Sequence, residues 1–232
     1  MMLNEMFCSI QGEGRYAGTP AIFIRMQGCP VRCHFCDTKQ SWSTSGCGEE
    51  KTVEQVINDV YAIAGQHPQV RLVVITGGEP FFACSGKELS MLLSELKNIG
   101  YLLSIETSGV CDVASDLDVE LLYRCHLTIS PKYNSPEDVT FLPVPDVLLR
   151  HPNCDAKLLV NGTAQAEKRC HNYITAWIAA RDHILVSDHV FVQPLDAGSE
   201  FPNRLANMQA VELAKRYGWR VSCQVHKFLS IQ

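Results

Sequence analysis

The chain has 232 residues, a formal net charge of −5 and 19% charged residues, so no large basic field points to a direct nucleic-acid partner. With 46% hydrophobic residues it has the composition of an ordinary globular protein, and we expect a single domain over residues 1–232. The first residues are acidic without a long apolar stretch, and no run approaches the ~18 apolar residues of a membrane span. These features predict a cytoplasmic protein without a membrane partner, whose cysteines stay reduced unless they bind metal.

Short apolar runs alternate with helical patterns along the chain, without a repeat or a low-complexity segment. Strands are predicted, in chain order, at residues 21–26, 71–76, 102–106, 126–130, 156–160, 190–193 and 220–223. Amphipathic helices are predicted at residues 52–64, 85–99 and 206–217, and the first of them begins with a possible capping box of Thr52 and Gln55.

The order of these elements predicts the fold class. Alternation of strands and helices in one direction favours parallel βαβ units. A complete eightfold barrel takes about 250 residues, whereas the strands here support about six units. We therefore predict an α/β fold, an incomplete (β/α)6-type TIM-like barrel that is open on one side. In such folds the reactive residues gather at the carboxyl ends of the strands.

Three cysteines follow the first predicted barrel strand, in the pattern C-x3-C-x2-C of Cys29, Cys33 and Cys36. One short turn can converge three thiolates, but a cubane iron–sulfur cluster normally takes four ligands, so one iron stays open to another molecule. A structural zinc would need a fourth ligand, and His34 lies too close in sequence to complete a tetrahedron easily. A redox C-x-x-C pair would leave Cys29 unexplained. The spacing favours the cluster, with zinc or thiol chemistry as alternatives.

Polar residues follow several predicted strands. The two glycines of the first such run let backbone groups approach a ligand closely. Taken singly, each run is more often a turn or a helix cap. Their recurrence at successive strand ends favours contact with a ligand. The runs are Thr76-Gly77-Gly78-Glu79-Pro80, Glu106-Thr107-Ser108-Gly109, Ser130-Pro131-Lys132 and Gln193-Pro194.

The segment before the first barrel strand, residues 9–14, is too polar and too rich in glycine to be only a core strand. Gln11 and Glu13 supply the amide and the carboxylate needed to read the edge of a pterin-like or guanine-like ring. Arg25 lies between apolar neighbours in a strand and favours an anionic partner such as a carboxylate. The alternative for Arg25 is an internal ion pair with Glu13 or Glu79.

Two further residues are candidates. Thr38, two positions after Cys36, could ligate a hard cation through its hydroxyl, although such a threonine is usually a helix cap. His226 lies past the last predicted strand and could contact a substrate, although a histidine near a chain end is more often exposed to solvent.

Together these motifs resemble those of the 7-carboxy-7-deazaguanine synthases, a family of the radical S-adenosylmethionine (SAM) superfamily. The likeness covers nearly the whole chain, and its most specific parts are residues 11–14, residues 36–38 and the Gly-Gly-Glu-Pro run. It implies the incomplete barrel of that superfamily, with a short N-terminal extension that binds the substrate. It also implies a ring contraction of 6-carboxy-5,6,7,8-tetrahydropterin to 7-carboxy-7-deazaguanine with release of ammonia, a step in queuosine and other 7-deazapurine biosynthesis.

The resemblance implies a 4Fe–4S cluster, SAM and Mg²⁺ as cofactors, a flavodoxin-like or ferredoxin-like reductant, and a homodimer. An electron passed to the cluster would cleave SAM to a 5′-deoxyadenosyl radical, which takes a hydrogen from C6 of the pterin and regains it after the rearrangement. The protein would position the reactive carbon and exclude quenching, because the cofactor carries the radical chemistry.

The same resemblance implies a role for each matching residue. The cluster would be ligated by Cys29, Cys33 and Cys36, and magnesium by Thr38. The substrate would be contacted by Ile10, Gln11, Gly12, Glu13, Arg25, Thr76 and His226. SAM would be contacted by Phe35, Asp37, Gly77, Gly78, Glu79, Ser108, Ser130, Pro131, Lys132 and Gln193.

Two other functions fit part of the pattern. A glycyl-radical activase shares the cysteine and Gly-Gly-Glu-Pro motifs but acts on a protein backbone, whereas Gln11, Glu13 and Arg25 favour a small acidic heterocycle. An electron-transfer or regulatory iron–sulfur protein would need no Gly-Gly-Glu-Pro pocket. The linker that contains Cys47, and residues 137–154, match no motif and receive no role.

Overall fold

The computed structural model of the chain describes residues 1–44, 48–135, 138–180 and 187–231, so Cys47 and Glu137 lie outside the described residues. The strands are β1 (Met2–Ile10), β2 (Pro20–Met26), β3 (Glu49–Glu50), β4 (Leu72–Thr76), β5 (Leu102–Thr107), β6 (His126–Ile129), β7 (Cys154–Val160), β8 (Val190–Pro194) and β9 (Arg220–Val221). The helices are α1 (Val53–Gln66), α2 (Pro80–Ala83), α3 (Gly86–Ile99), α4 (Val119–Tyr123), α5 (Asp146–Leu149), α6 (Ala164–Ala180), α7 (Glu200–Tyr217) and α8 (Val225–Leu229). Short 3₁₀ turns are η1 (Gly14–Tyr16), η2 (Lys39–Ser41) and η3 (Ser187–His189).

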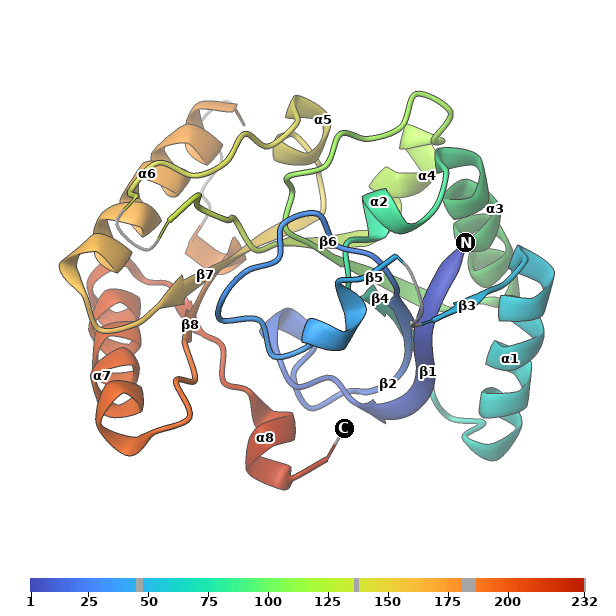
Figure 1. Cartoon of the computed structure of the whole chain (residues 1–232), viewed down its shortest axis with the longest axis horizontal. Coiled ribbons are helices and arrows are strands. Elements are labelled where there is room, and N and C mark those ends of the chain that lie inside the picture. Colours follow the sequence, from blue (N-terminus) through green and yellow to red (C-terminus); the bar gives the residue numbers. More distant parts are fainter. Residues whose placement is uncertain (45–47, 136–137, 181–186, 232) are drawn as a thin grey trace.

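The strands form one sheet in the order β3-β1-β2-β4-β5-β6-β7-β8-β9. Pairing from β2 to β9 is parallel throughout, whereas β1 pairs antiparallel with β2 and with β3. Figure 1 shows this sheet curving around the centre of the molecule, with α1, α3, α4, α6 and α7 on its outer side. Because the strand order has two ends rather than closing on itself, the predicted incomplete barrel is confirmed.

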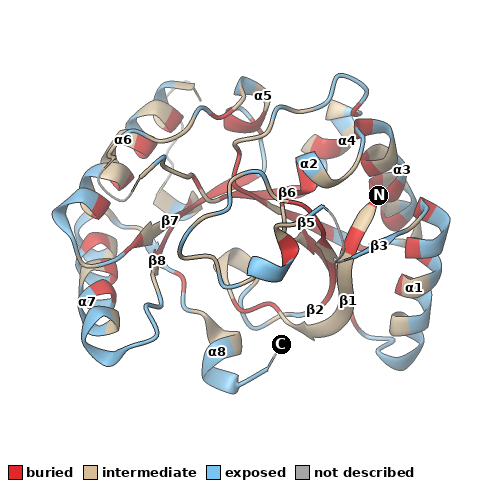
Figure 2. Cartoon of the chain, viewed as in Figure 1, coloured by how far each residue is buried: buried red, intermediate tan, exposed pale blue. Residues whose placement is uncertain are grey.

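Two of the helices, α1 and α3, begin at capping boxes. The backbone N–H of Gln55 donates to the Thr52 hydroxyl at 3.2 Å, and the N–H of Thr52 donates to the Gln55 side chain at 2.8 Å, which completes the predicted capping box of α1. Ser85 and Glu88 form a second box at the start of α3. Burial is concentrated on the strands and on the helix faces that pack against them, as Figure 2 shows. None of the described helices is long and apolar enough to cross a membrane.

Several elements differ from the sequence-based expectation: the short elements β3, α2, α4 and α5 were not predicted, and three larger differences concern β1, α6 and the end of the chain. Strand β1 was not predicted, because most of its residues are only half-buried at the antiparallel end of the sheet and it lacks a clean apolar face. Helix α6 was not predicted either, and its buried residues are spread among polar ones. The last predicted strand is shorter than expected, with β9 ending at Val221 and the chain continuing into α8.

The C-terminal segment closes the open side of the barrel. The N–H of Val225 donates to the carbonyl of Gly12 at 3.0 Å, and the N–H of Gly14 donates to the Ser222 hydroxyl at 2.9 Å. A Cβ at Gly12 would lie only 1.9 Å from Nδ1 of His226, so glycine is required for this approach. In Figure 1, α8 lies between the edge at β8 and the β1–β2 hairpin. Residues far apart in sequence thereby meet over the interior of the barrel.

Neighbouring positions of α3 give a test of the core. Leu92 is fully buried, whereas Met91 is half exposed. Replacing Leu92 with Ala removes buried methyl groups and leaves a cavity, so we expect the free energy of unfolding to fall by about 2–5 kcal/mol. Met91→Ala is the matched control and should change it by less than about 0.5 kcal/mol. Urea unfolding measures both, and equal effects would contradict this packing.

Candidate active site

A cavity of about 520 Å³ occupies the carboxyl-end half of the barrel. It is enclosed by the loop after β2, the β1–β2 loop and the C-terminal segment. Of the residues to which the sequence assigned a role, the cavity is lined by Ile10, Gln11, Gly12, Glu13, Arg25, Cys29, Cys33, Phe35, Cys36, Asp37, Thr38, Thr76, Gly77, Gly78, Ser108, Ser130, Lys132, Gln193 and His226. Glu79 and Pro131 are not among its lining residues.

The three cysteines lie on the loop after β2, which is pinned at its base. The N–H of Gly28 donates to the Ser41 carbonyl at 2.8 Å, and the N–H of Cys29 donates to the Trp42 carbonyl at 3.1 Å. A tight turn brings Cys36 back onto Cys33, with a backbone hydrogen bond of 3.0 Å. All ten cysteines among the described residues are free thiols. The loop therefore presents three unpaired sulfur ligands to one cavity.

The donor set of this loop fits an iron–sulfur cluster better than a single metal ion. No group of three or more His, Cys, Asp or Glu side chains in the described part of the chain is arranged to hold one ion. A cubane cluster does not require that arrangement, because each cysteine ligates a different iron atom. Burial raises the pKa of the Cys33 thiol, while the nearby Lys132 ammonium lowers it. Burial is the larger of the two effects, so the pKa of Cys33 is raised overall, and the half-buried Lys132 ammonium only limits that rise.

Lys132 and Ser130 form the part of the wall next to this loop. The Lys132 ammonium donates to the carbonyl of Ser130 at 2.6 Å and to its hydroxyl at 2.8 Å. Burial lowers the pKa of Lys132, and the Cys33 sulfur opposes that shift. The position of the ammonium is therefore set by the loop after β6, within electrostatic range of Cys33 and Cys29.

The Gly77–Gly78 turn after β4 docks onto the cysteine loop. The N–H of Gly78 donates to the Ser41 hydroxyl at 3.0 Å, and the N–H of Glu79 donates to the Gly28 carbonyl at 2.8 Å. Gly77 has φ +66°, and a Cβ there would lie 2.0 Å from Cγ of Arg25. Only glycine meets both conditions, so the backbone of this turn forms cavity wall directly beneath the loop.

Glu79 differs from the expectation that its carboxylate faces the cavity. It is 1% exposed and accepts hydrogen bonds from the Thr107 hydroxyl at 2.6 Å, from the Ser108 N–H at 2.9 Å and from the Ser108 hydroxyl. It also accepts from the N–H of Phe81 at the start of α2. Its side chain thus links the ends of β4 and β5. The adjacent residues Gly77 and Gly78 line the cavity in its place.

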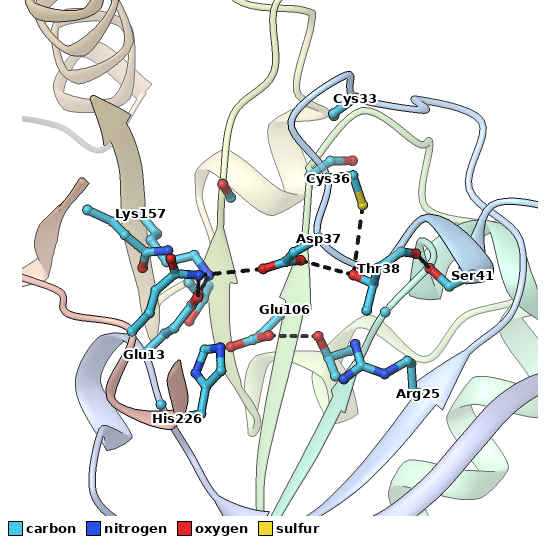
Figure 3. A pocket seen from close by; sticks show the side chains of 18 of the residues that line it. Glu13, Arg25, Cys33, Cys36, Asp37, Thr38, Ser41, Glu106, Lys157 and His226 are labelled. Carbon is cyan, nitrogen blue, oxygen red and sulfur yellow. Dashed lines mark hydrogen bonds and ion pairs between the residues drawn. The ribbon is translucent and has the colours of Figure 1, made fainter. Parts of the chain in front are cut away.

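Gln11 is held on the cavity wall by Glu106. The Gln11 amide donates to Oε1 of Glu106 at 3.0 Å, and the Thr76 hydroxyl donates to Oε2 at 2.7 Å. The N–H of Glu13 donates to the Gln11 side-chain oxygen at 3.2 Å. Figure 3 shows Glu106 between the Glu13 side and the Arg25 side of the cavity. The sequence placed Glu106 at a strand end but gave it no role, because nothing local reveals that its carboxylate orients Gln11.

Lys157 is the clearest residue that sequence reasoning missed. It lies inside β7, and its ammonium pairs with Oε2 of Glu13, while Oε1 of Glu13 accepts from the Gln224 amide at 2.8 Å. Burial acts to raise the pKa of Glu13, but Lys157, together with Gln224 and His226, outweighs burial and lowers that pKa to about 2. Burial acts to lower the pKa of Lys157, but Glu13 and Glu106 outweigh it and raise that pKa. The sequence signal that could have identified it is a lysine inside an otherwise largely apolar strand, the same kind of signal that singled out Arg25.

Arg25 pairs with neither Glu13 nor Glu79, so the predicted alternative for it is wrong in its partners. Its Nε donates to Glu5 on the adjacent strand β1 at 2.8 Å, and its guanidinium lies 5.6 Å from the centre of the Phe7 ring. The bond to Glu5 and the ring fix the plane of the guanidinium, which carries five N–H donors in all. Arg25 lines the cavity and presents a cation there.

Thr38 and Gln193 lie at two further points of the wall. The Thr38 hydroxyl donates to the Asp37 carboxylate at 3.2 Å and lies 3.8 Å from the Cys36 sulfur. A hydroxyl beside a carboxylate is a set of hard oxygen donors, the type that Mg²⁺ prefers. Gln193 is nearly buried and accepts from the Ser222 hydroxyl at 2.9 Å, which ties the end of β8 to the C-terminal segment.

A buried ionic cluster anchors the β1–β2 loop below the cavity. Asp155, 1% exposed, lies on β7 two residues before Lys157. It accepts from Nε and Nη2 of Arg15 at 2.8 and 2.6 Å, and pairs with His126 and His189, each at 2.9 Å. Burial acts to raise the pKa of Asp155, but its bonds with His126 and Arg15 outweigh burial and lower it. Arg15 follows Gln11 and Glu13 closely, so this cluster fixes their loop to the barrel.

Asp155→Asn should reveal this anchor. Removing the charge leaves Arg15 without its ionic partner and changes the carboxylate oxygen that is bonded to His126, so we expect a loss of about 3–5 kcal/mol in the free energy of unfolding at pH 7. Because the pKa of Asp155 is depressed on folding, its contribution is present above about pH 4 and is lost as the pH falls through the folded-state value. Denaturant unfolding from pH 7 to pH 3 measures the difference in the free energy of unfolding between Asp155→Asn and wild type. This difference should become smaller below pH 4. Asp112→Asn, at an exposed position, is the control, and a difference that stays constant with pH would contradict the anchor.

Comparison with known proteins agrees with this geometry. Residues 23–153 match the Radical SAM superfamily. The chain is 32% identical to the 7-carboxy-7-deazaguanine synthase of Escherichia coli K12, over 99% of this chain and 98% of that protein. It is 31% identical to the enzyme of the same name from Buchnera aphidicola, with 99% and 98% covered. The crystal structure of QueE from Escherichia coli superimposes with a TM-score of 0.68 at 28% identity, covering 95% of this chain and 92% of that one.

Proposed function

Because the chain belongs to the 7-carboxy-7-deazaguanine synthase family of radical SAM enzymes, we propose that it contracts the ring of 6-carboxy-5,6,7,8-tetrahydropterin. The products are 7-carboxy-7-deazaguanine and ammonia, in a step of queuosine or other 7-deazapurine biosynthesis. The observation that carries this proposal is one cavity that joins three unpaired cysteines to a wall of Gln11, Glu13 and Arg25. Such a wall suits a ring with an N–H edge at one end and a carboxylate at the other.

The cluster and SAM belong in the part of the cavity next to the cysteine loop. Cys29, Cys33 and Cys36 would ligate three irons of a 4Fe–4S cluster, and the cluster with SAM supplies a radical that abstracts hydrogen from the substrate. The chain contributes the backbone of Gly77 and Gly78, with Lys132 and Ser130 on the adjoining wall. Phe35, Asp37, Ser108 and Gln193 are the other side chains that line the space assigned to SAM.

The substrate belongs in the part of the cavity that is lined by Gln11, Glu13 and Arg25. Glu13 accepts from N–H groups of the ring edge, and Gln11 offers its amide beside it. Arg25 binds the carboxylate through the donors that Glu5 leaves available, since a planar guanidinium suits bidentate recognition. Thr76, Ile10, Gly12 and His226 enclose the remaining faces. Held between these groups, the reactive carbon of the ring faces the cysteine loop.

Magnesium, the reductant and the assembly are further parts of the proposal. Thr38, with Asp37 beside it, would ligate Mg²⁺ together with an oxygen of the substrate. A flavodoxin-like or ferredoxin-like protein would supply the electron, and two copies of the chain would form a homodimer in the cytoplasm. Residues 1–232 would act as one domain, with the β1–β2 loop as the substrate-binding extension.

An anaerobic assay tests the function. The reconstituted protein is mixed with SAM, Mg²⁺, a reductant and 6-carboxytetrahydropterin, and the products are followed by mass. We expect 7-carboxy-7-deazaguanine with SAM largely unconsumed and less product when Mg²⁺ is omitted. Cys33→Ala should abolish both the cluster absorbance and turnover, whereas Cys223→Ala, at an exposed thiol, should preserve both. Cleavage of SAM with the pterin intact would refute this substrate and favour a glycyl-radical activase.

Arg25→Ala tests how the carboxylate is bound. Losing a partly buried charge partner should lower kcat/KM for the pterin by roughly 30- to 3,000-fold, with cluster content and SAM binding unchanged. Arg25→Lys, which keeps the charge without the planar fork, should fall between Arg25→Ala and wild type. Arg204→Ala, on the exposed face of α7, is the control. Loss of the cluster in Arg25→Ala would show that Arg25 serves the fold instead.

A further inference from the structure

The pair of Glu13 and Lys157 places two opposite charges almost out of water. Their side chains are 14% and 11% exposed, and 144 residues separate them in sequence. Removing two ions from water costs several kcal/mol each, so a buried pair is weak evidence for a gain in stability over apolar residues. A strand interior that would pack well with an apolar residue carries a lysine here. This calls for a reason beyond folding.

The pair holds a carboxylate with both oxygens oriented. Lys157 takes Oε2, the Gln224 amide takes Oε1, and the backbone N–H of Glu13 is held by Gln11. Each carboxylate oxygen has two lone pairs, so one on each oxygen remains for a ligand. Figure 3 shows Glu13 and Lys157 together on one side of the cavity, with Asp37 and Glu106 also in view. The carboxylate can thus accept two parallel N–H groups from a ring edge.

We propose that Lys157 is a positioning residue that holds Glu13 as an oriented anion through the buried ion pair, and so makes the cavity select rings whose edge presents two N–H donors. This rests on the proposed function, in which a pterin is the ligand, and adds the residue that sets its edge specificity. Lys157 acts through Glu13, and no contact between Lys157 and the ring is required.

The charges around Glu13 explain why the lysine is needed. Apart from Lys157, it faces Gln224 and His226 of the C-terminal segment, while Glu106 of β5 and Asp37 of the cysteine loop bring further negative charge to the same ammonium. The ammonium of Lys227, on the same segment, pairs with Asp37 and Asp196 and not with Glu13. Without Lys157, burial would therefore favour a protonated Glu13. A protonated Glu13 carries one O–H donor. It can therefore no longer accept two N–H groups of a ring edge, one on each oxygen.

The first experiment needs no ligand. Thermal unfolding midpoints are measured anaerobically on the full-length, cluster-loaded protein between pH 5.5 and 8.5. The proteins are wild type, Lys157→Met, Glu13→Gln, the double variant and Lys157→Arg. The difference between Lys157→Met and the double variant isolates Glu13, because every other titrating group is common to both.

The sign of that difference is determined by linkage. In Lys157→Met the folded-state pKa of Glu13 rises above its unfolded value near 4.3, so stability falls as the pH rises through the window. We expect the midpoint of Lys157→Met to fall by roughly 3–5 °C per pH unit relative to the double variant. Wild type should show no such slope against the double variant, since the pKa of its Glu13 is about 2 and the pKa of its Lys157 is raised, so neither group titrates in the window. Absence of the slope in Lys157→Met would overturn the proposal.

The second experiment measures selection between two ring edges. The probes are 6-carboxypterin and 6-carboxylumazine, which replaces the 2-amino donor with an oxo acceptor. Dissociation constants are taken from ligand fluorescence on the SAM-loaded holoenzyme, without reductant. Wild type and Lys157→Arg should prefer the pterin, whereas Lys157→Met at pH 6 should bind it roughly 10- to 100-fold more weakly and lose most of the preference. A preference unchanged in Lys157→Met would overturn the proposal.

The two experiments separate the two conclusions. If wild type binds neither probe, the proposed substrate fails, and the midpoint series still decides whether Lys157 keeps Glu13 charged. If Lys157→Met does not fold, the double variant, which leaves no charge without a partner, should restore folding, and rescue by Glu13→Gln supports the proposal. A double variant that stays unfolded would assign Lys157 a packing role and overturn it.

Discussion

Closure of an open barrel by its own C-terminal segment is the constraint on which the site depends. A sheet whose two ends do not meet leaves its interior accessible between β9 and β3. The backbone bond from Val225 to Gly12, with His226 packed against a residue that has no Cβ, joins the C-terminal segment to the β1–β2 loop. The polar interior of the barrel becomes a cavity of defined shape as a result. Glu13, Gln224 and His226 are neighbours only because of this contact.

The opposite wall depends on the parallel pairing of β2 with β4. Their carboxyl ends lie side by side, with Arg25 in register with Thr76. The cysteine loop after β2 and the glycine turn after β4 are therefore close enough to exchange backbone hydrogen bonds through Gly28 and Ser41. Glu79 strengthens the arrangement from below by joining the turn to the end of β5. The loop that carries the three cysteines is thus braced by the barrel.

Several charges in the interior occur in ion pairs between residues of different elements. Arg25 pairs with Glu5 across β1 and β2, Lys157 pairs with Glu13 across β7 and the β1–β2 loop, and Asp155 gathers Arg15 with two histidines. Each pair ties the β1–β2 hairpin to the parallel sheet or to itself. The same hairpin carries Gln11 and Glu13 into the cavity. The groups that fix its position and the groups that face a ligand therefore alternate along one short segment.

Local patterns in the sequence were sufficient for much of this description. The spacing of three cysteines, the capping boxes and the alternation of apolar runs with amphipathic helices each act over a few residues, so they can be read before the chain is folded. The polar strand ends were predicted to meet because parallel strands share one carboxyl edge. The family resemblance then assigned roles to individual residues, and most of these residues line one cavity in the structure.

Tertiary structure alone decided which polar groups use one another. No local sequence feature distinguishes Glu79, whose carboxylate accepts hydrogen bonds from Thr107 and Ser108, from Glu13, which lines the cavity. Strand β1 was hidden because its residues are only half-buried, and Lys157 because its partner lies 144 residues away. A carboxylate or an ammonium has the same intrinsic chemistry anywhere in a chain. Its role is set by burial and by the charge beside it, and both exist only once distant segments have packed together.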